Sequence, residues 1–466
     1  MSQIYDAIIV GAGVSGSWIA NALVQGGMRC LMLEAGQQFT RDSYPRNELD
    51  ANAQLYWGGG TELTSDASIA LLRPKVVGGG SVVNQALLDR FDDVALDAWR
   101  ETSGVDFLAR PELDPWYDRA SDQIRIQTVP EAFANGNAGV FRRGFEANGY
   151  RLAPLERAQR DCRFQDGNSC IVCLAGCPID SKQSTPVTVL RRALETGLEL
   201  VSEFEAKRVE ESGDEVSVTG VGADGASVTH RGRRLVLACG AIGNSRLLLA
   251  SDFESKLPAL GRGFYTHPQY MHLAFYDETI DAFKGPLQSY KSDDPSFRRD
   301  GFKLENVFAP PVGLALLIPG VGAVHQDRMR RLRHIACVEV AVRDTNPGRI
   351  RLTRGGGLVI EKVLNDEDRR RRARGFEAVR NIFTSTGARE IVEGSIAIGL
   401  HLMGGCSLGV DAATSVVSPE FRLHGSRSIY AADSSVFPNA PGINPSFTIM
   451  ALSLRAAGEI LQEARA

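Results

Sequence analysis

The sequence lacks a strong excess of either charge and any long uninterrupted hydrophobic run. Its 466 residues include 52 basic and 56 acidic side chains, a formal net charge of −4. Nucleic-acid-binding proteins usually show a basic excess or a clustered basic stripe. The one dense arginine run, at 369–374, follows three acidic residues and is expected on an exposed helix. The apolar stretch 307–324 contains three prolines and three glycines, which excludes a spanning helix there.

A secretory leader is also missing, and histidine is scarce. Residues 1–6 run directly into a predicted strand without a basic or apolar leader segment, which favours the cytoplasm. Only seven histidines occur, and none precedes His230. Glycine is abundant by contrast, with 48 residues. A protein that grips a cofactor through its backbone needs many such positions.

The order of predicted elements indicates an α/β protein. A buried strand at 4–10, a glycine-rich turn, a helix at 17–25 and a second strand at 30–34 form a βαβ opening. Residues 199–232 alternate like antiparallel strands, and 235–240 reads as another buried strand. Residues 264–395 differ in character and predict an inserted sheet-and-helix unit. The chain ends in a predicted helix at 445–464.

The first turn carries a dinucleotide-binding pattern. Gly11, Gly13 and Gly16 follow the first strand, and Glu34 lies 21 residues after Gly13. Glycines at these positions allow a tight turn, approach of a pyrophosphate to the helix N-terminus and close packing of helix on strand. Glu34 can accept hydrogen bonds from ribose hydroxyls.

A second glycine-rich loop distinguishes between FAD and NAD as the bound dinucleotide. Gly78, Gly79, Gly80 and Ser81 precede Asn84. A nicotinamide-binding fold needs no second loop here, whereas the longer FAD molecule requires extra backbone contacts. The sequence therefore favours FAD over NAD.

Four blocks together resemble the glucose–methanol–choline (GMC) oxidoreductase family. They are 11–16 with Glu34, VGGGSVVN at 77–84, CGAIGNSRLLL at 239–249, and the stretch 401–449 with HLMGGC, ADSSVFP and GINPSFTI. The motifs are most similar to those of the cholesterol oxidase and long-chain alcohol oxidase branches. The resemblance implies a Rossmann-like FAD-binding domain with an inserted α+β substrate domain built on an antiparallel sheet.

This resemblance also implies how the chain is divided. The FAD-binding domain would comprise 1–105, 186–263 and 396–466, the last with the catalytic motif. Residues 106–185 would connect the parts and hold a cysteine cluster, and 264–395 would bind the substrate. The predicted cofactor-binding residues are Gly11, Gly13, Val14, Ser15, Gly16, Glu34, Gly79, Gly80, Ser81, Asn84, Ala241, Asp433, Asn444 and Pro445. Some relatives attach the flavin to a histidine near the second loop. This chain has none there, so the FAD is expected to be non-covalent.

Two residues are the catalytic candidates. His401 lies in a glycine-rich block, where a neutral imidazole could remove the hydroxyl proton of an alcohol. The alternative is a histidine that only packs in the core. The family's second active-site position falls on Asn444, whose amide could orient the hydroxyl, and the alternative is a turn residue before Pro445. His267 is expected to be a packing residue.

Cys162, Cys170, Cys173 and Cys177 form a C-x7-C-x2-C-x3-C cluster followed by a proline. Short spacings of this kind gather thiolates around an iron–sulfur cluster, and a zinc site could use the same four. Disulfides or free thiols are further alternatives. An iron–sulfur cluster would hand electrons to a partner protein or quinone.

The sequence thus predicts FAD-dependent oxidation of a primary or secondary alcohol, with hydride transfer to flavin N5 and His401 as base. A nicotinamide-dependent dehydrogenase and a non-catalytic electron-relay flavoprotein are the alternatives. Residues 307–324 are predicted to be irregular, because their prolines and glycines interrupt any regular element. They would form either an apolar loop over the substrate entrance or a buried connector in the second domain.

Overall fold

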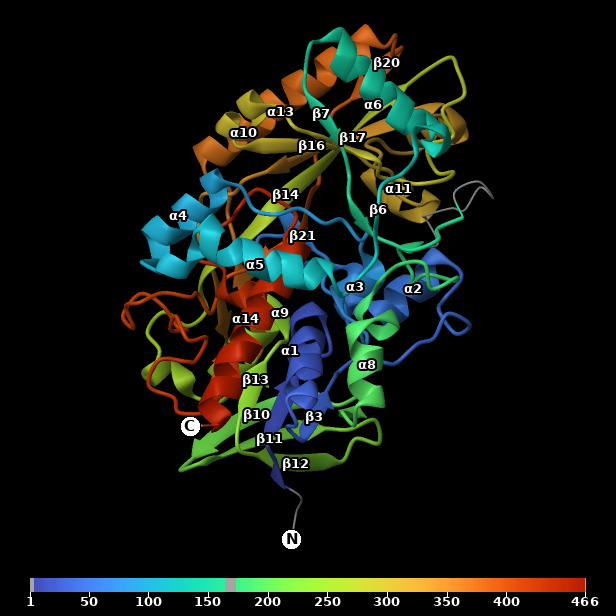
Figure 1. Ribbon diagram of the computed structural model, residues 1–466. Coiled ribbons are helices and arrows are strands. Elements are labelled where there is room, and N and C mark those ends of the chain that lie inside the picture. The colour runs from blue at the N-terminus through green and yellow to red at the C-terminus, as the bar shows by residue number, and fades with distance from the viewer. Residues whose placement is uncertain (1–3, 164–172, 466) are drawn as a thin grey trace.

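A parallel sheet forms the lower half of the molecule in Figure 1. The computed structural model describes residues 4–163 and 173–465. The strands of this sheet come from distant parts of the chain, in the order β22 (Ile429–Ala431), β13 (Leu235–Leu237), β2 (Ala7–Val10), β3 (Cys30–Leu33) and β9 (Glu199–Val201). Neighbouring strands are parallel throughout. The three central strands are buried along their whole length, which explains their uninterrupted apolar sequences.

Helices flank this sheet and direct their N-termini at its upper edge. They include α1 (Val14–Gln25), α8 (Val189–Glu195), α9 (Gly240–Ala250) and α14 (Ser446–Arg465). Helix α14 packs along α1, with a Ser453–Ser15 hydroxyl hydrogen bond of 2.9 Å between them. Outside them lie α4 (Asp93–Ser103) and α5 (Arg110–Ser121) (Figure 1).

A four-stranded sheet lies at the bottom of the molecule. Its order is β1 (Ile4–Tyr5), β12 (Ser227–Gly232), β11 (Glu215–Val221) and β10 (Glu205–Ser212). The last three are antiparallel, as predicted, over 205–232. The first residues of the predicted stretch, Glu199–Val201, instead form β9 and pair parallel with β3. The predicted strand 4–10 is divided at Asp6, whose carboxylate accepts a hydrogen bond from the Arg29 amide. Its first residues pair with β12 rather than continuing β2.

A second, mainly antiparallel sheet fills the upper half. Its long central strand β14 (Arg262–Phe275) pairs with β17 (Ile335–Val342) and β21 (Ala397–Met403). The other strands are β4 (Glu62–Leu63), β5 (Ile69–Leu71), β7 (Leu152–Pro154), β15 (Tyr290–Ser292), β16 (Phe302–Asn306), β18 (Gly348–Leu352), β19 (Leu358–Glu361) and β20 (Glu390–Val392). Helices α6 (Gly136–Ala147), α10 (Pro295–Asp300) and α13 (Asp366–Ser385) cover it (Figure 1). The sheet is not confined to 264–395, because β4, β5, β7 and β21 come from outside that range.

The arginine run lies on the predicted helix. Arg369 and Arg370 of α13 are exposed and pair with acidic residues of its first turn. Asn365 and Asp368 cap the helix reciprocally, which fixes its start. Within the described chain, no helix is long and apolar enough to cross a membrane.

The prediction of an irregular segment at 307–324 is wrong. Residues Pro311–Leu317 form helix α11, and α12 (Ala323–Arg330) begins at the end of the stretch. Pro311 stands in the first turn, where a proline removes no helical hydrogen bond. The Glu48 carboxylate of α2 (Glu48–Leu55) accepts the free amides of Val312 and Gly313 at 2.8 and 2.9 Å.

Candidate active site

A cavity of about 1790 Å³ runs between the parallel sheet and the large antiparallel sheet. Its walls include Val10 and Leu33 at the ends of β2 and β3, and Gln269, Met271 and His401 of the upper sheet. Typical small-molecule pockets measure roughly 300–1,000 Å³. The cavity therefore has room for a dinucleotide together with a substrate.

The two glycine-rich loops meet at this cavity. Gly11 has φ +104°, and a Cβ there would stand 2.3 Å from the Ala238 carbonyl oxygen. A Cβ on Gly79 would stand 2.7 Å from the Cα of Gly13, so the two loops lie back to back. Around Gly80 a Cβ would meet nothing within 4 Å. This arrangement leaves backbone amides accessible at the N-terminus of α1, which is where a pyrophosphate binds.

Two carboxylates flank these loops, the half-buried Glu34 and the buried Asp433. Glu34 accepts the amides of Ala12 and Gly36, both at 2.8 Å, and Asp433 accepts the amides of Gly240 at 2.6 Å and Ser435 at 2.8 Å. Burial raises the pKa of both carboxyls against the opposing effect of these hydrogen bonds. Both line the cavity, and each keeps lone pairs that hydroxyl groups of a ligand could use.

Most predicted cofactor residues line the cavity. Two do not. Gly16 packs α1 on its own loop, since a Cβ there would stand 1.9 Å from the Gly11 carbonyl oxygen. Ser81 turns its hydroxyl to the Gly78 carbonyl, at 2.6 Å, and accepts the Thr185 amide. The cavity-lining members are Gly11, Gly13, Val14, Ser15, Glu34, Gly79, Gly80, Asn84, Ala241, Asp433, Asn444 and Pro445.

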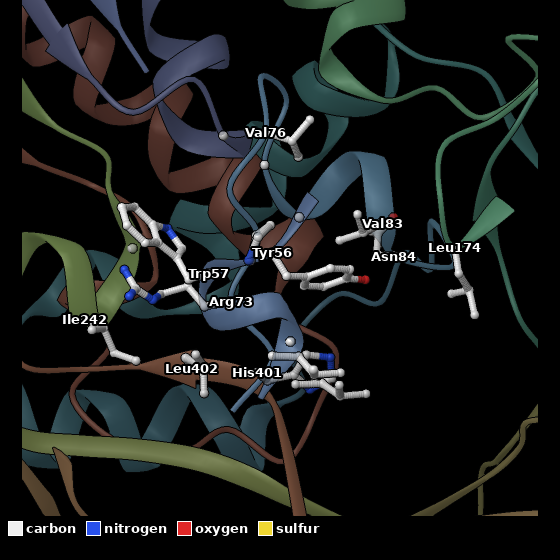
Figure 2. Close-up of a pocket in the computed structure, with 18 of the residues that line it drawn as sticks. Tyr56, Trp57, Arg73, Val76, Val83, Asn84, Leu174, Ile242, His401 and Leu402 are labelled. Atoms are coloured by element: carbon white, nitrogen blue, oxygen red, sulfur yellow. The ribbon is translucent and has the colours of Figure 1, made fainter. Parts of the chain in front are cut away.

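Sequence reasoning missed an aromatic–cationic group in the wall. Figure 2 shows the Trp57 ring beside Arg73, whose guanidinium carbon lies 4.5 Å from the ring centroid. The Glu62 carboxylate holds the guanidinium through two hydrogen bonds of 2.9 and 2.6 Å. These residues belong to an irregular, glycine-rich region with no motif spacing, so only the fold brings them together.

The second missed feature is the partner of His401. The Nδ1 atoms of His401 and His267 lie 3.0 Å apart, and the Gly442 amide donates to Nε2 of His267 at 2.9 Å. His267, expected to be a packing residue, is therefore in contact with the catalytic candidate. Burial, followed by the nearby Lys303 charge, lowers the pKa of His401 to about 3. Burial and the neighbouring charges also hold the pKa of His267 well below its usual range.

The direction of these hydrogen bonds fixes the protons of both rings. An amide can only donate, so Nε2 of His267 must be the acceptor and its proton must be on Nδ1. That proton is donated to Nδ1 of His401, whose own proton is then on Nε2. At rest, His401 thus presents an N–H donor, whereas the predicted base needs a lone pair at Nε2.

Asn444 is oriented so that its hydrogen-bond acceptor is free, whereas His401 presents a donor. Its amide nitrogen donates to Asp89 at 3.1 Å and to Glu305 at 3.0 Å, which leaves its carbonyl oxygen as the free acceptor. Lys303 joins the same two carboxylates at 2.9 and 2.5 Å, and Lys291 also pairs with Asp89. The lysines hold the pKa of Asp89 below its usual range despite its burial.

The cysteine segment lies to one side of the cavity. Cys170 falls outside the described residues, and Cys162 is half-buried. Cys173 and Cys177 are buried, and a hydrogen bond from Cys173 is the main cause that lowers the pKa of Cys177 to about 5. Residues 4–163 and 173–465 contain no group of three or more metal-ligating side chains that could hold a metal ion. The predicted iron–sulfur cluster thus finds no support in the structure.

Comparison with known proteins agrees with this architecture. Sequence models of GMC oxidoreductases match residues 52–269 and 345–453. An uncharacterized GMC-type oxidoreductase of Mycobacterium tuberculosis is 27% identical over 97% of this chain and 75% of its own. A long-chain-alcohol oxidase of Arabidopsis thaliana is 25% identical over 98% of this chain and 67% of its own. The crystal structure of pyridoxine 4-oxidase from Mesorbium loti shares the fold, with a TM-score of 0.75 and 18% identity over 99% of both chains. The chain therefore belongs to the GMC oxidoreductase family.

Proposed function

We propose that this protein oxidises the CH–OH group of a small-molecule alcohol, with FAD bound non-covalently in the cavity. The observation that carries the proposal is the placement of His401 and Asn444 in the wall of one cavity with the two glycine-rich loops. The family membership and the similarity to a long-chain-alcohol oxidase support it.

The residues present fit FAD. The amides at the start of α1 and the glycines at 11, 13, 79 and 80 would hold the pyrophosphate, and Glu34 would hold a ribose. When bound, FAD supplies an acceptor for the two electrons and the hydrogen removed from the carbinol carbon. Pro445 precedes α14, whose partly positive N-terminus would favour a developing negative charge.

His401 and Asn444 would bind the substrate hydroxyl group in complementary roles, one as a hydrogen-bond donor and the other as an acceptor. The Nε2–H of His401 donates to the oxygen, and the carbonyl oxygen of Asn444 accepts its hydroxyl proton. One donor and one acceptor fix the hydroxyl in a single orientation and thereby aim the carbinol hydrogen.

Removal of the hydroxyl proton by His401 requires a change in the histidine pair. The proton of His401 must be on Nδ1 and the bond to His267 must reverse, which turns a protonated Nε2 of His267 toward the Gly442 amide. Losing that buried hydrogen bond costs about 1–3 kcal/mol. We assign the resting tautomer to substrate binding and the reversed, less populated one to proton removal.

Anaerobic reduction of the bound flavin tests the proposal. The purified protein should be yellow, release its flavin on acid precipitation, and bleach with at least one member of a panel of primary and secondary alcohols. His401→Ala should retain flavin but slow bleaching by a factor on the order of 10² or more, because its contact with the reacting oxygen is lost. His334→Ala, outside the cavity, is the matched control. A colourless protein that binds NAD would favour the dehydrogenase alternative, and a flavoprotein that no alcohol bleaches would favour electron relay.

The electron acceptor is a separate question for the same enzyme. Reoxidation of the reduced flavin by O₂, compared with a quinone or an artificial one-electron acceptor, distinguishes an oxidase from a dehydrogenase. Iron and acid-labile sulfide analysis of anaerobically purified protein tests the cysteine cluster directly. Full flavin content without iron, even after reconstitution, would exclude the cluster.

A further inference from the structure

One acidic side chain in the cavity wall is not used by the proposed chemistry. Glu339 lies on β17, is only 2% exposed, and lines the cavity. Across the described chain no hydrogen bond or ion pair joins its carboxyl group to another side chain or to the backbone. A buried polar group is normally paired, because leaving it unpaired costs about 1–3 kcal/mol. The missing partner points to a ligand.

The sheet register places Glu339 beside the machinery that holds Asn444. Glu339 stands directly opposite Glu305 of β16 and opposite Met271 of β14. Side chains opposite one another on neighbouring strands lie on the same face, roughly 5 Å apart. The Glu305 carboxylate in turn contacts Asn444 at 3.0 Å. Glu339 therefore lies one strand spacing beyond Glu305, the residue that contacts Asn444.

Charge distinguishes Glu339 from its neighbours. Asp89 and Glu305 are matched by Lys291 and Lys303, which contact them directly. Glu305 also accepts the Gln288 amide at 2.7 Å. Among the described residues, no cation contacts Glu339 directly. Burial, followed by repulsion from Glu305, holds its pKa well above its usual range, against the smaller opposing attraction of Lys303. The local set is thus two acids in direct contact with two lysines, and one further acid that no described cation contacts.

We propose that Glu339 forms a subsite for a protonated amine, so that the substrate is an amino alcohol. This inference rests on the proposed alcohol oxidation and adds the substrate class to it. An ammonium group beside Glu339 supplies both the missing hydrogen-bond donors and the missing positive charge. An anionic group would face three carboxylates here and is disfavoured.

The surroundings limit the form of the substrate. Met271, Val307, Phe308 and Leu287 line the cavity around this row of the sheet with apolar surface. The chain between hydroxyl and amine would contact these residues. A nitrogen a few bonds from the reacting carbon spans the distance from Asn444 past Glu305 to Glu339.

Equilibrium binding to the oxidised holoenzyme tests the subsite without requiring turnover. The probes are linear alkylamines of three to six carbons and the matching alkanes in which CH₃ replaces NH₃⁺, neither of which has a hydroxyl group to oxidise. Binding is measured by flavin difference spectra and by calorimetry. We expect the amine of the best chain length to bind at least tenfold more tightly than its methyl counterpart. Glu339→Gln, which keeps the shape but removes the charge, should abolish that ratio, and Glu361→Gln, an acid on β19 outside the cavity, should keep it.

Proton release gives a second readout. Burial holds the pKa of Glu339 above its usual range, and an ammonium bound beside the carboxylate would lower that pKa and release protons to the buffer. Calorimetry in two buffers of different ionisation enthalpy should therefore show proton release on amine binding in the wild type and none in Glu339→Gln.

The outcomes separate the two proposals. Equal binding of amine and methyl probes, or an unchanged ratio in Glu339→Gln, would overturn the amine subsite even if alcohols bleach the flavin. Selective amine binding that depends on Glu339, without bleaching by any alcohol, would keep the subsite and reject alcohol oxidation. If Glu339→Gln does not fold with full flavin, the wild-type ratio and proton count decide alone.

Discussion

A single backbone amide determines what the histidine pair can do. The Gly442 N–H can only donate, so the proton of His267 is on Nδ1. His267 donates that proton to Nδ1 of His401, so the proton of His401 is on Nε2. Control thus runs from the main chain of the loop before α14 to a ring that lines the cavity. The amide side chain of Asn444 is fixed in a comparable way by two carboxylates.

At this scale the prediction concerns where the His401 proton resides. In resting enzyme labelled with ¹⁵N-histidine, two-bond ¹H–¹⁵N correlation spectra should show His401 as the neutral Nε2–H tautomer, because Nδ1 is occupied as an acceptor. It should stay neutral from pH 8 to about pH 4, since burial lowers its pKa to about 3. His401→Gln identifies its signals. A signal of the Nδ1–H tautomer at rest would contradict the relay.

Among the elements, helix α11 contributes both to the stability of the fold and to the lining of the cavity. Its N-terminal amides are held by Glu48 of α2, and its residues Leu316 and Leu317 line the cavity. Neighbouring leucines of this helix differ sharply in environment: Leu314 is 1% exposed and Leu316 is 69% exposed.

Substitution of these two leucines by serine should have opposite consequences. Leu314→Ser should lower the free energy of unfolding by about 2–5 kcal/mol, since it removes a buried side chain and buries a hydroxyl. Leu316→Ser should change it by no more than about 0.5 kcal/mol and instead raise the KM for a bulky apolar alcohol. Denaturant unfolding and steady-state kinetics measure the two effects. Equal destabilisation by both would show that α11 is ordinary core.

The sequence predicted the elements whose local pattern is strong. The glycine turn after β2, the buried strand Leu235–Leu237 and the helix with the arginine run were recognisable because apolar runs, glycine spacing and charge patterns are local signals. Helix α11 was missed because its prolines and glycines stand at its start and around its ends, where a helix tolerates them.

The candidate site could be predicted only where chemistry accompanies a motif. His401 and Asn444 stand in recognisable blocks and do line the cavity. The pairing of Asp89, Lys303 and Glu305 with Asn444 has no sequence signal, because long-range register brings these residues together. The upper sheet was likewise predicted too narrowly, since its edge strands come from before residue 155.

For the molecule as a whole, buried neutral histidines make stability sensitive to acid. His272 of β14 accepts the Gly394 amide at 3.0 Å, and burial lowers its pKa to about 3. The unfolded chain binds a proton at this residue near pH 6.5, but the folded protein does not. Stability is therefore fully present above pH 6.5 and is lost as the pH falls toward 3.

The contribution of His272 can be isolated by substitution. Between pH 7 and pH 5 this residue should cost the folded protein about 2 kcal/mol, because only the unfolded state takes up the proton. His272→Asn should reduce the loss of unfolding free energy over that interval by this amount. Denaturant titrations of the wild type and the variant at both pH values provide the comparison. An identical pH dependence in the two proteins would show that His272 does not titrate as the burial implies.

The strand order of the parallel sheet has a consequence for how the protein is made. Strand β2 is synthesised first, yet its sheet is completed by β13 and then by β22, and α14 packs on α1 only when residues beyond 446 exist. The ribosome adds roughly 5–20 residues per second, so β22 and α14 are synthesised roughly 20–90 s after β2. The nascent chain cannot close the cavity during that interval. Capture of the cofactor is thus a late step, one that follows synthesis of β22 and α14.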